Sequence, residues 1–235
     1  MAIAFINSTA LTIGTAASTW SIPTHSSRAG GAAFIVGLGP ASSAVTVSTV
    51  TDNTTNVYRL AVRQGTPKPA ASAELWYVSA ISSASTRVSV TLSGNSSGSL
   101  AVGQWSGVST GNPVHMTGST AITANSTVHR AAEITPTSNG TLIVAFHRAN
   151  VSTISPTAVD NSFSQWVTTG GAVRTMGLYA IQGTASTASG QWRTNAAGTS
   201  GGCQHSGVIA SFSDTADAVV AGGGYVDAFN LMGVL

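Results

Sequence analysis

The sequence predicts an all-β protein whose main body is a single large antiparallel β-sandwich of about a dozen strands, with a jelly-roll-like topology. Polar and apolar residues alternate with period 2 in many short segments, and turn-forming residues separate these segments. No segment holds apolar residues at helical spacing over three turns. With 43% hydrophobic residues, the 235-residue chain can fill a substantial core.

The strands are expected where the pattern and the residue types agree. Residues 32–36 and 142–146 are continuous apolar runs, which are typical of central strands covered on both faces. Residues 45–50 and 87–92 alternate and are rich in β-branched side chains, so they are expected to be half-buried strands. Further strands are expected near residues 10–14, 57–63, 73–80, 100–107, 127–133, 163–168, 173–182, 188–194 and 206–213. The turn formers between strands include Asp52-Asn53, Ser93-Gly94-Asn95, Ser138-Asn139-Gly140 and Gly170-Gly171.

The chain also repeats itself, which predicts an internal pseudo-duplication. Four landmarks of the first half recur in the same order in the second half, offset by 102 to 109 residues. They begin at Gly31, Asp52, Glu74 and Gly103, and recur near Gly140, Asp160, Gly177 and Val208. The halves could be tandem domains or parts of one sandwich. Because the join at 108–127 carries apolar residues and no linker of the domain-boundary kind, we favour one sandwich domain over residues 1–213.

Residues 214–235 depart from this pattern and are expected to form an extended tail that anchors the protein. Gly222-Gly223-Gly224 is a flexible joint in composition, and the segment after it is strongly apolar. Such a segment either folds back onto its own sandwich or docks on another chain. The residues expected to bind a partner are Tyr225, Val226, Phe229, Leu231, Met232, Val234 and Leu235.

Enzymatic chemistry is not expected from this sequence. No phosphate-binding glycine loop and no Gly-x-Ser-x-Gly elbow occurs, the five histidines show no metal-ligand spacing, and Cys203 is the single cysteine. Asp52 and Asp160 each precede an asparagine, a pair typical of turns. Glu74 and Glu133 stand alone in strand-like stretches, where edge or partner-facing positions are expected. We therefore expect no catalytic residues, no cofactor and no metal.

The distribution of charged and apolar residues argues against two classes of partner, nucleic acids and membranes. Charged residues make up only 7% of the chain, against about 25% in typical proteins, and the net charge is +2. The basic residues are scattered singly, so nucleic-acid binding is not expected. The N-terminus lacks the pattern of a secretory signal, and no apolar run approaches the roughly 20 residues that span a bilayer, so no membrane partner is expected.

Tryptophans offer a possible surface for sugars. Trp76 and Trp105 fall within strands beside apolar neighbours, so core packing is expected for them. Trp166 and Trp192 lie nearer to loops. These two are the candidates for stacking against a glycan.

Several segments together resemble a known group of modules. Asp52 to Tyr58 resembles its turn, and residues 74–78, 87–94 and 105–108 resemble its strands. The group comprises β-sandwich modules of bacteriophage virion proteins and of large bacterial surface proteins. The resemblance covers roughly residues 31–213. It implies a sandwich fold and an exposed structural or adhesive role, with no catalytic residues.

These observations lead to a functional expectation. The chain is expected to be a phage virion structural protein, a capsid decoration (cement) protein on the virion surface that is made in the host cytoplasm. It is expected to form a homo-oligomer, with a trimer favoured, and to bind a major capsid protein or another virion protein. The alternative is a glycan- or receptor-binding module of a tail fibre or surface adhesin.

Overall fold

The computed structural model describes residues 2–24, 32–64, 72–81, 85–122, 126–149, 156–159, 162–169, 174–194 and 204–214. All secondary-structure elements in these residues are β-strands, and all strand pairs are antiparallel, as the sequence predicts. A helix with the length and apolar character needed to cross a membrane does not occur within the described ranges.

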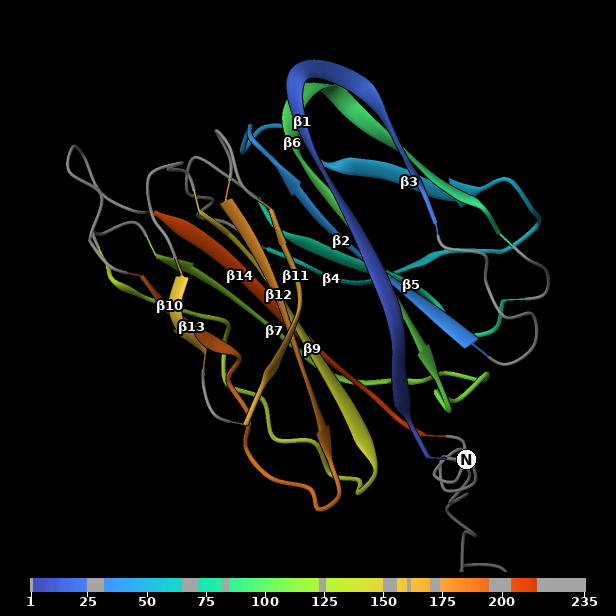
Figure 1. Cartoon of the computed structure of the whole chain (residues 1–235), viewed down its shortest axis with the longest axis vertical. Coiled ribbons are helices and arrows are strands. Elements are labelled where there is room, and N and C mark those ends of the chain that lie inside the picture. Colours follow the sequence, from blue (N-terminus) through green and yellow to red (C-terminus); the bar gives the residue numbers. More distant parts are fainter. Residues whose placement is uncertain are drawn as a thin grey trace, which may run out of the picture.

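The first half of the chain forms one sheet that bends into two layers. Its strands are β1 (Ala4–Pro23), β2 (Ala32–Pro40), β3 (Val47–Asp52), β4 (Arg59–Arg63), β5 (Glu74–Val78) and β6 (Arg87–Ser106). The main layer has the order β1-β6-β2-β5-β4. β1 and β6 pair along almost their whole length and bend together, with register shifts between Ile13 and Thr19 (Figure 1). Beyond the bend, the end of β1 and the start of β6 form an outer layer, in which β3 pairs with β6.

The second half forms two separate sheets. Its strands are β7 (Val114–Ile122), β8 (Val128–Arg130), β9 (Thr141–Ala149), β10 (Pro156–Val159), β11 (Ser164–Thr169), β12 (Arg174–Gln182), β13 (Gln191–Thr194) and β14 (His205–Phe212). The main sheet has the order β11-β12-β9-β14-β7, and a small outer sheet has the order β10-β13-β8.

The two halves share one topology, which confirms the predicted duplication. The order β1-β6-β2-β5-β4 of the first main layer corresponds, strand for strand, to β7-β14-β9-β12-β11 of the second. The outer layers correspond in the same way, because the far ends of β1 and β6 match β8 and β13, and β3 matches β10. Each half therefore distributes its strands over two facing layers in a jelly-roll-like order.

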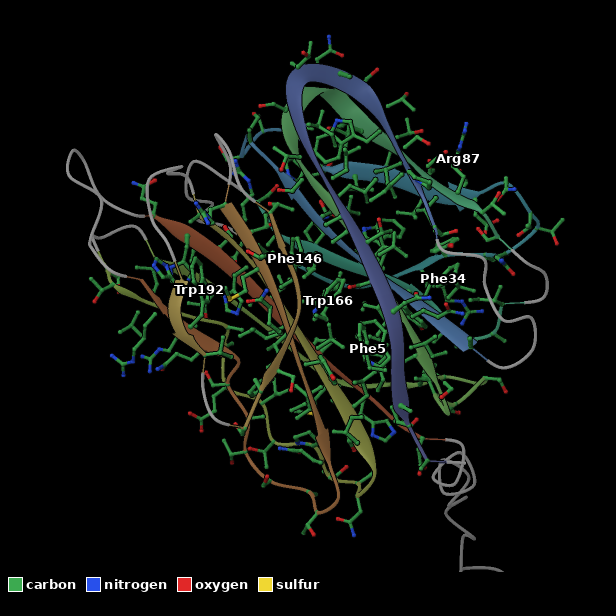
Figure 2. All side chains as sticks on the ribbon, in the orientation of Figure 1. Phe5, Phe34, Arg87, Phe146, Trp166 and Trp192 are labelled. Atoms are coloured by element: carbon green, nitrogen blue, oxygen red, sulfur yellow. The ribbon has the colours of Figure 1, made fainter. Side chains whose placement is uncertain are left out.

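Three apolar cores lie between the four layers. One core, which includes Phe34, fills the space between the two layers of the first half. The central core lies between the two main sheets and contains Trp105, Phe146 and Trp166. A third core, which includes Trp192, lies between the main and outer sheets of the second half. Figure 2 shows Phe146 and Trp166 near the middle of the molecule, with Phe34 and Trp192 to either side of them.

β2 and β9 lie at the centre of this stack. Every residue of both strands is buried, because each main sheet has a core on both faces. The continuous apolar runs at 32–36 and 142–146 predicted such strands.

The main sheets pack around an approximate two-fold axis that passes between β2 and β9. A Cβ placed on Gly37 would lie 2.4 Å from Phe146, and one on Gly39 would lie 2.6 Å from Arg148. Both pairs are separated by the offset of 109 residues that relates the halves, so equivalent positions face each other. The edges follow the same relation, since β1 packs on β11 and β4 packs on β7. A small residue in one half thus accommodates a large one in the other.

Two expectations about local structure are wrong. The turn expected at Ser93-Gly94-Asn95 lies inside β6, because the paired bend of β1 and β6 carries both strands through this region without a hairpin. β1 runs from Ala4 to Pro23, far beyond the expected 10–14. Its small and polar residues show little alternation, because most positions on both faces of the strand are exposed or only partly buried.

Candidate functional site

The apolar tail lies outside the described residues. This applies to every residue expected to bind a partner there, namely Tyr225, Val226, Phe229, Leu231, Met232, Val234 and Leu235. The role of these residues stays a prediction.

The two tryptophans expected to stack on a glycan are both buried, so that interpretation of Trp166 and Trp192 needs correction. Trp166 is 4% exposed and makes an edge contact with Trp105, with ring centroids 5.5 Å apart. Trp192 is fully buried in the third core. Although both residues lie near loops in sequence, their strands turn these side chains toward the interior. Trp105 is buried as expected, and Trp76 is partly buried.

Asp52 organises the turn after β3, as the sequence predicts. Its Oδ1 accepts hydrogen bonds from the backbone N–H of Thr54 (2.8 Å) and from the Thr54 hydroxyl (2.6 Å). Its Oδ2 accepts from Asn56 at 2.7 Å and from the Tyr58 hydroxyl at 3.2 Å. Partial burial raises the pKa of Asp52, but these hydrogen bonds outweigh it and the net pKa lies below the usual 3.8. The equivalent Asp160 lies outside the described residues.

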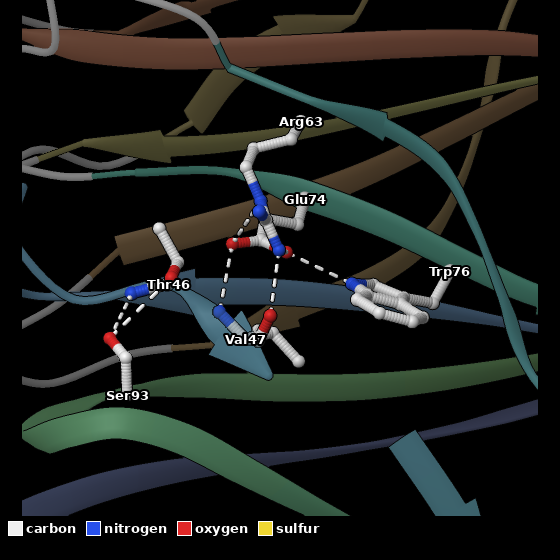
Figure 3. Close-up of polar contacts among 6 residues, drawn as sticks. All are labelled: Thr46, Val47, Arg63, Glu74, Trp76 and Ser93. Carbon is white, nitrogen blue, oxygen red and sulfur yellow. Dashed lines mark hydrogen bonds and ion pairs between the residues drawn. The ribbon is translucent and has the colours of Figure 1, made fainter. Parts of the chain in front are cut away.

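Glu74 is a buried structural carboxylate, which corrects the expectation of an edge or partner-facing position (Figure 3). Its oxygens accept hydrogen bonds from the Val47 backbone N–H at 3.1 Å and from Trp76 Nε1 at 2.9 Å. Arg63 forms an ion pair with it at 3.0 Å and also donates to the Val47 carbonyl at 2.7 Å. This network ties β3 of the outer layer to β4 and β5 of the main sheet, and its groups serve one another rather than a ligand.

The described surface includes a shallow hollow beside β7 and β8 and another beside β5. The larger one, about 320 Å³, lies beside β7 and β8. Its polar lining residues are Thr120, Arg130, Glu133 and Ser189, of which Glu133 is exposed. The smaller hollow, about 190 Å³, lies beside β5 and includes Arg59 and Tyr77. Neither hollow has the enclosed apolar lining with convergent polar groups that is typical of small-molecule sites.

Three histidines form a cluster of titratable side chains in the third core. His129 of β8, His147 of β9 and His205 of β14 are all fully buried. Ring centroids are 4.7 Å apart for His129 and His205, and 6.2 Å apart for His147 and His205. Trp192 covers the group, with its ring 4.5 Å from that of His129. His205 Nε2 lies 3.3 Å from the backbone N and 3.2 Å from the carbonyl O of Arg130, so it bonds Arg130 in either tautomer.

Burial holds these imidazoles in their neutral form. Burial together with the nearby His205 lowers the pKa of His129 to about 3. Burial lowers the pKa of His205 to about 4, against a smaller opposite effect of its bond to Arg130. Burial, with the other two histidines, lowers the pKa of His147 well below its usual range. At neutral pH the cluster is therefore uncharged.

The cluster was not predicted, because its members come from three strands and show no local motif. One signal was present in the sequence: His129 and His147 lie 109 residues after Trp20 and Leu38, at positions that a strand places in the core. Across the described parts of the chain, the histidine, cysteine and carboxylate side chains form no group of three or more that could hold a metal ion.

Comparisons with known proteins identify no relative. The chain matches no family model, no curated protein and no solved structure. The class of protein is defined by the architecture alone, which is an all-β protein of antiparallel sheets packed against each other.

Proposed function

We propose that the chain is a bacteriophage structural protein, a capsid decoration (cement) protein that binds and stabilises the particle surface. The observation that carries this proposal is the stack of two jelly-roll-like halves whose main sheets cover each other. Sandwiches of this kind occur in viral capsid and lectin domains. The surroundings of the described carboxylates and histidines favour structural roles over chemistry, since Glu74 and Asp52 are saturated by internal hydrogen bonds.

The amino-acid composition supports a protein whose surface is in contact with other proteins in an assembly. With only 7% charged residues, its surface is polar through serine, threonine and asparagine. We propose a homotrimer that binds the major capsid protein or another virion protein at the outer surface, after synthesis in the host cytoplasm. The apolar segment 225–235 is proposed to supply the anchoring contact.

The alternative, a glycan- or receptor-binding module of a tail fibre or adhesin, has lost its residue-level support. It depended on Trp166 and Trp192, and both rings are buried. The cement protein is therefore the function that we propose.

Particle location and tail dependence test this function. Immunogold labelling of particles produced from the genome that encodes the chain is expected to decorate the capsid surface. A chain that ends at residue 221 is expected to keep its strand signal in circular dichroism but to lose particle binding or its trimeric mass in light scattering. A matched variant of full length, in which serine replaces Tyr225, Phe229 and Leu231, separates the loss of apolar side chains from the loss of chain length. Particles without label would contradict the proposed function. A shortened chain that assembles and binds particles normally would contradict the anchoring role of residues 225–235.

A further inference from the structure

In the first half, other residues occupy the positions equivalent to the three histidines. Strand register relates the positions, because Trp20 pairs with Val90 on β6 as His129 pairs with Trp192 on β13. The partners on the main sheets correspond in the same way. The equivalents of His129, His147 and His205 are Trp20, Leu38 and Gly98, respectively. Trp20 and Leu38 are buried in the core of the first half, so the topology itself does not require histidine at these sites.

The outer layers of the two halves are attached differently. In the first half, β1 and β6 run without interruption from the main layer into the outer layer. In the second half the outer strands form a sheet of their own, and residues 126 and 127, between β7 and β8, lie outside any strand. β8, which has described residues outside any strand on both sides, is only three residues long. The second outer sheet therefore depends more on packing across its core.

The histidines lie across this interface between layers. His129 and its neighbour Trp192 belong to the outer sheet, whereas His147 and His205 belong to the main sheet. An edge contact joins His129 to His205 across the two layers, and the bond of His205 to the Arg130 backbone does the same. Separation of the layers would expose all three imidazoles to water.

The charges around the cluster do not favour protonation. On the elements packed around it, the charged side chains of the described residues are Arg130, Arg148, Arg174, Arg193 and, after β8, Glu133. Arg130 and Arg193 are exposed on the outer face of the small sheet, and Arg148 lies on the other face of β9. Arg174 begins β12 and carries the same sign as a protonated histidine. Glu133 is exposed, so no described carboxylate is buried beside the imidazoles.

We propose that the three histidines form an acid-sensitive latch, which keeps the outer sheet β10-β13-β8 on the second half at neutral pH and releases it in acid. The closed form holds its imidazoles neutral, whereas the open form binds protons near the ordinary pKa of 6.5. Opening is therefore unaffected above about pH 6.5 and increasingly favoured as the pH falls from there toward 4. Each histidine increases the ratio of open to closed form by up to about tenfold per pH unit. The latch follows from the second half alone and holds whatever the function of the chain.

Hydrogen exchange of the full chain, corrected for the intrinsic effect of pH, tests the latch. Between pH 7 and pH 4.5, the backbone amides of β8 and β13 are expected to lose protection by at least about 100-fold. Those in the outer layer of the first half, residues 19–23 and 87–92, are expected to keep theirs. Protection of β8 and β13 that does not change with pH would overturn the proposal. Equal loss in both halves would overturn it too, since that indicates global unfolding in acid.

Variants that copy the first half separate the latch from general acid sensitivity. His147→Leu places the first-half residue at the equivalent position and is expected to reduce the pH dependence by about one proton, or up to tenfold per pH unit. His129→Trp is a second variant with the same expectation, should His147→Leu fail to fold. His115→Gln is the matched control, because His115 is exposed near Ser138 and lies outside the cluster. A cluster variant with the pH dependence of the unmodified chain would contradict the latch.

Discussion

The two halves of the molecule place different polar groups at neighbouring positions of one shared core pattern. In the first half, Glu74 pairs in register with Leu38, and in the second half, Met176 pairs with His147. In the first half the polar residue of the pair is Glu74 on β5, whereas in the second half it is His147 on β9. The same backbone arrangement accepts both because each polar group is satisfied in its own way.

The difference lies in how the buried polar group is satisfied. Glu74 forms an ion pair with Arg63 and accepts further hydrogen bonds from Val47 and Trp76, so the carboxylate has partners within the core. The histidines are tolerated by staying neutral. The ion pair joins its layers through direct polar contacts, whereas the proposed latch of neutral imidazoles holds only at pH values where the histidines stay unprotonated. The halves therefore differ in how a buried polar group joins their layers.

The largest expected effect tests the two-fold packing between the halves. Gly37→Phe would place a second ring where Phe146 already lies, and is expected to destabilise the protein by at least about 4 kcal/mol. The exchange Gly37→Phe with Phe146→Gly is expected to recover part of this loss, because the two positions are equivalent. Urea denaturation measures both. Gly14→Ala is the control, since no atom lies within 4 Å of the added Cβ, and a change under about 1 kcal/mol is expected.

If the exchanged pair is no more stable than Gly37→Phe alone, the equivalence of these positions has no bearing on packing. The approximate two-fold axis would then describe the strand order and not the fit between the sheets.

The next effect tests whether the first half can take the core of the second. Register makes Thr168 the equivalent of Arg63 and Met176 the equivalent of Glu74. Glu74→Met alone is expected to cost about 2–4 kcal/mol at pH 7, because Arg63 and the Val47 N–H lose their acceptor. Adding Arg63→Thr is expected to reduce that cost, since both charges are then absent. A double-mutant cycle in urea measures the coupling, and additive losses would show that the ion pair contributes nothing as a pair.

Much of the fold could be predicted from the sequence, because it depends on patterns along the chain. The apolar runs at 32–36 and 142–146 indicated the central strands, and the similar offsets of four landmarks in the same order indicated the duplication. The course of β1 and β6 could not be predicted in this way. The local preference of Ser93-Gly94-Asn95 for a turn is overridden by pairing with β1, which the sequence of β6 alone does not reveal.

The histidine cluster could not be predicted for a related reason. His129, His147 and His205 are far apart in the chain and are brought together only by the pairing of β13 with β8 and of β14 with β9. The prediction for Trp166 and Trp192 was wrong for a different reason. Their nearness to loops suggested exposed rings, whereas burial depends on which face of the strand meets a neighbouring layer.

The smallest effect concerns Asp52, whose hydrogen bonds lie within the single turn after β3. Asp52→Asn is expected to cost about 1 kcal/mol at pH 7, because the hydrogen bonds from Thr54 and Asn56 lose a charged acceptor. The folded pKa of Asp52 is lowered, so its stabilisation is present above the unfolded value of 3.8 and is lost as the pH falls through the folded pKa. Thermal or urea unfolding at pH 7 and pH 3 measures this difference, and Ser93→Ala is the control, because it removes the bond from the Thr46 N–H without removing a titrating group. Between pH 6.5 and 4.5 the Asp52 variant is expected to follow the unmodified chain in parallel. A deviation in that window would assign part of the acid response to the first half and weaken the contrast between the two.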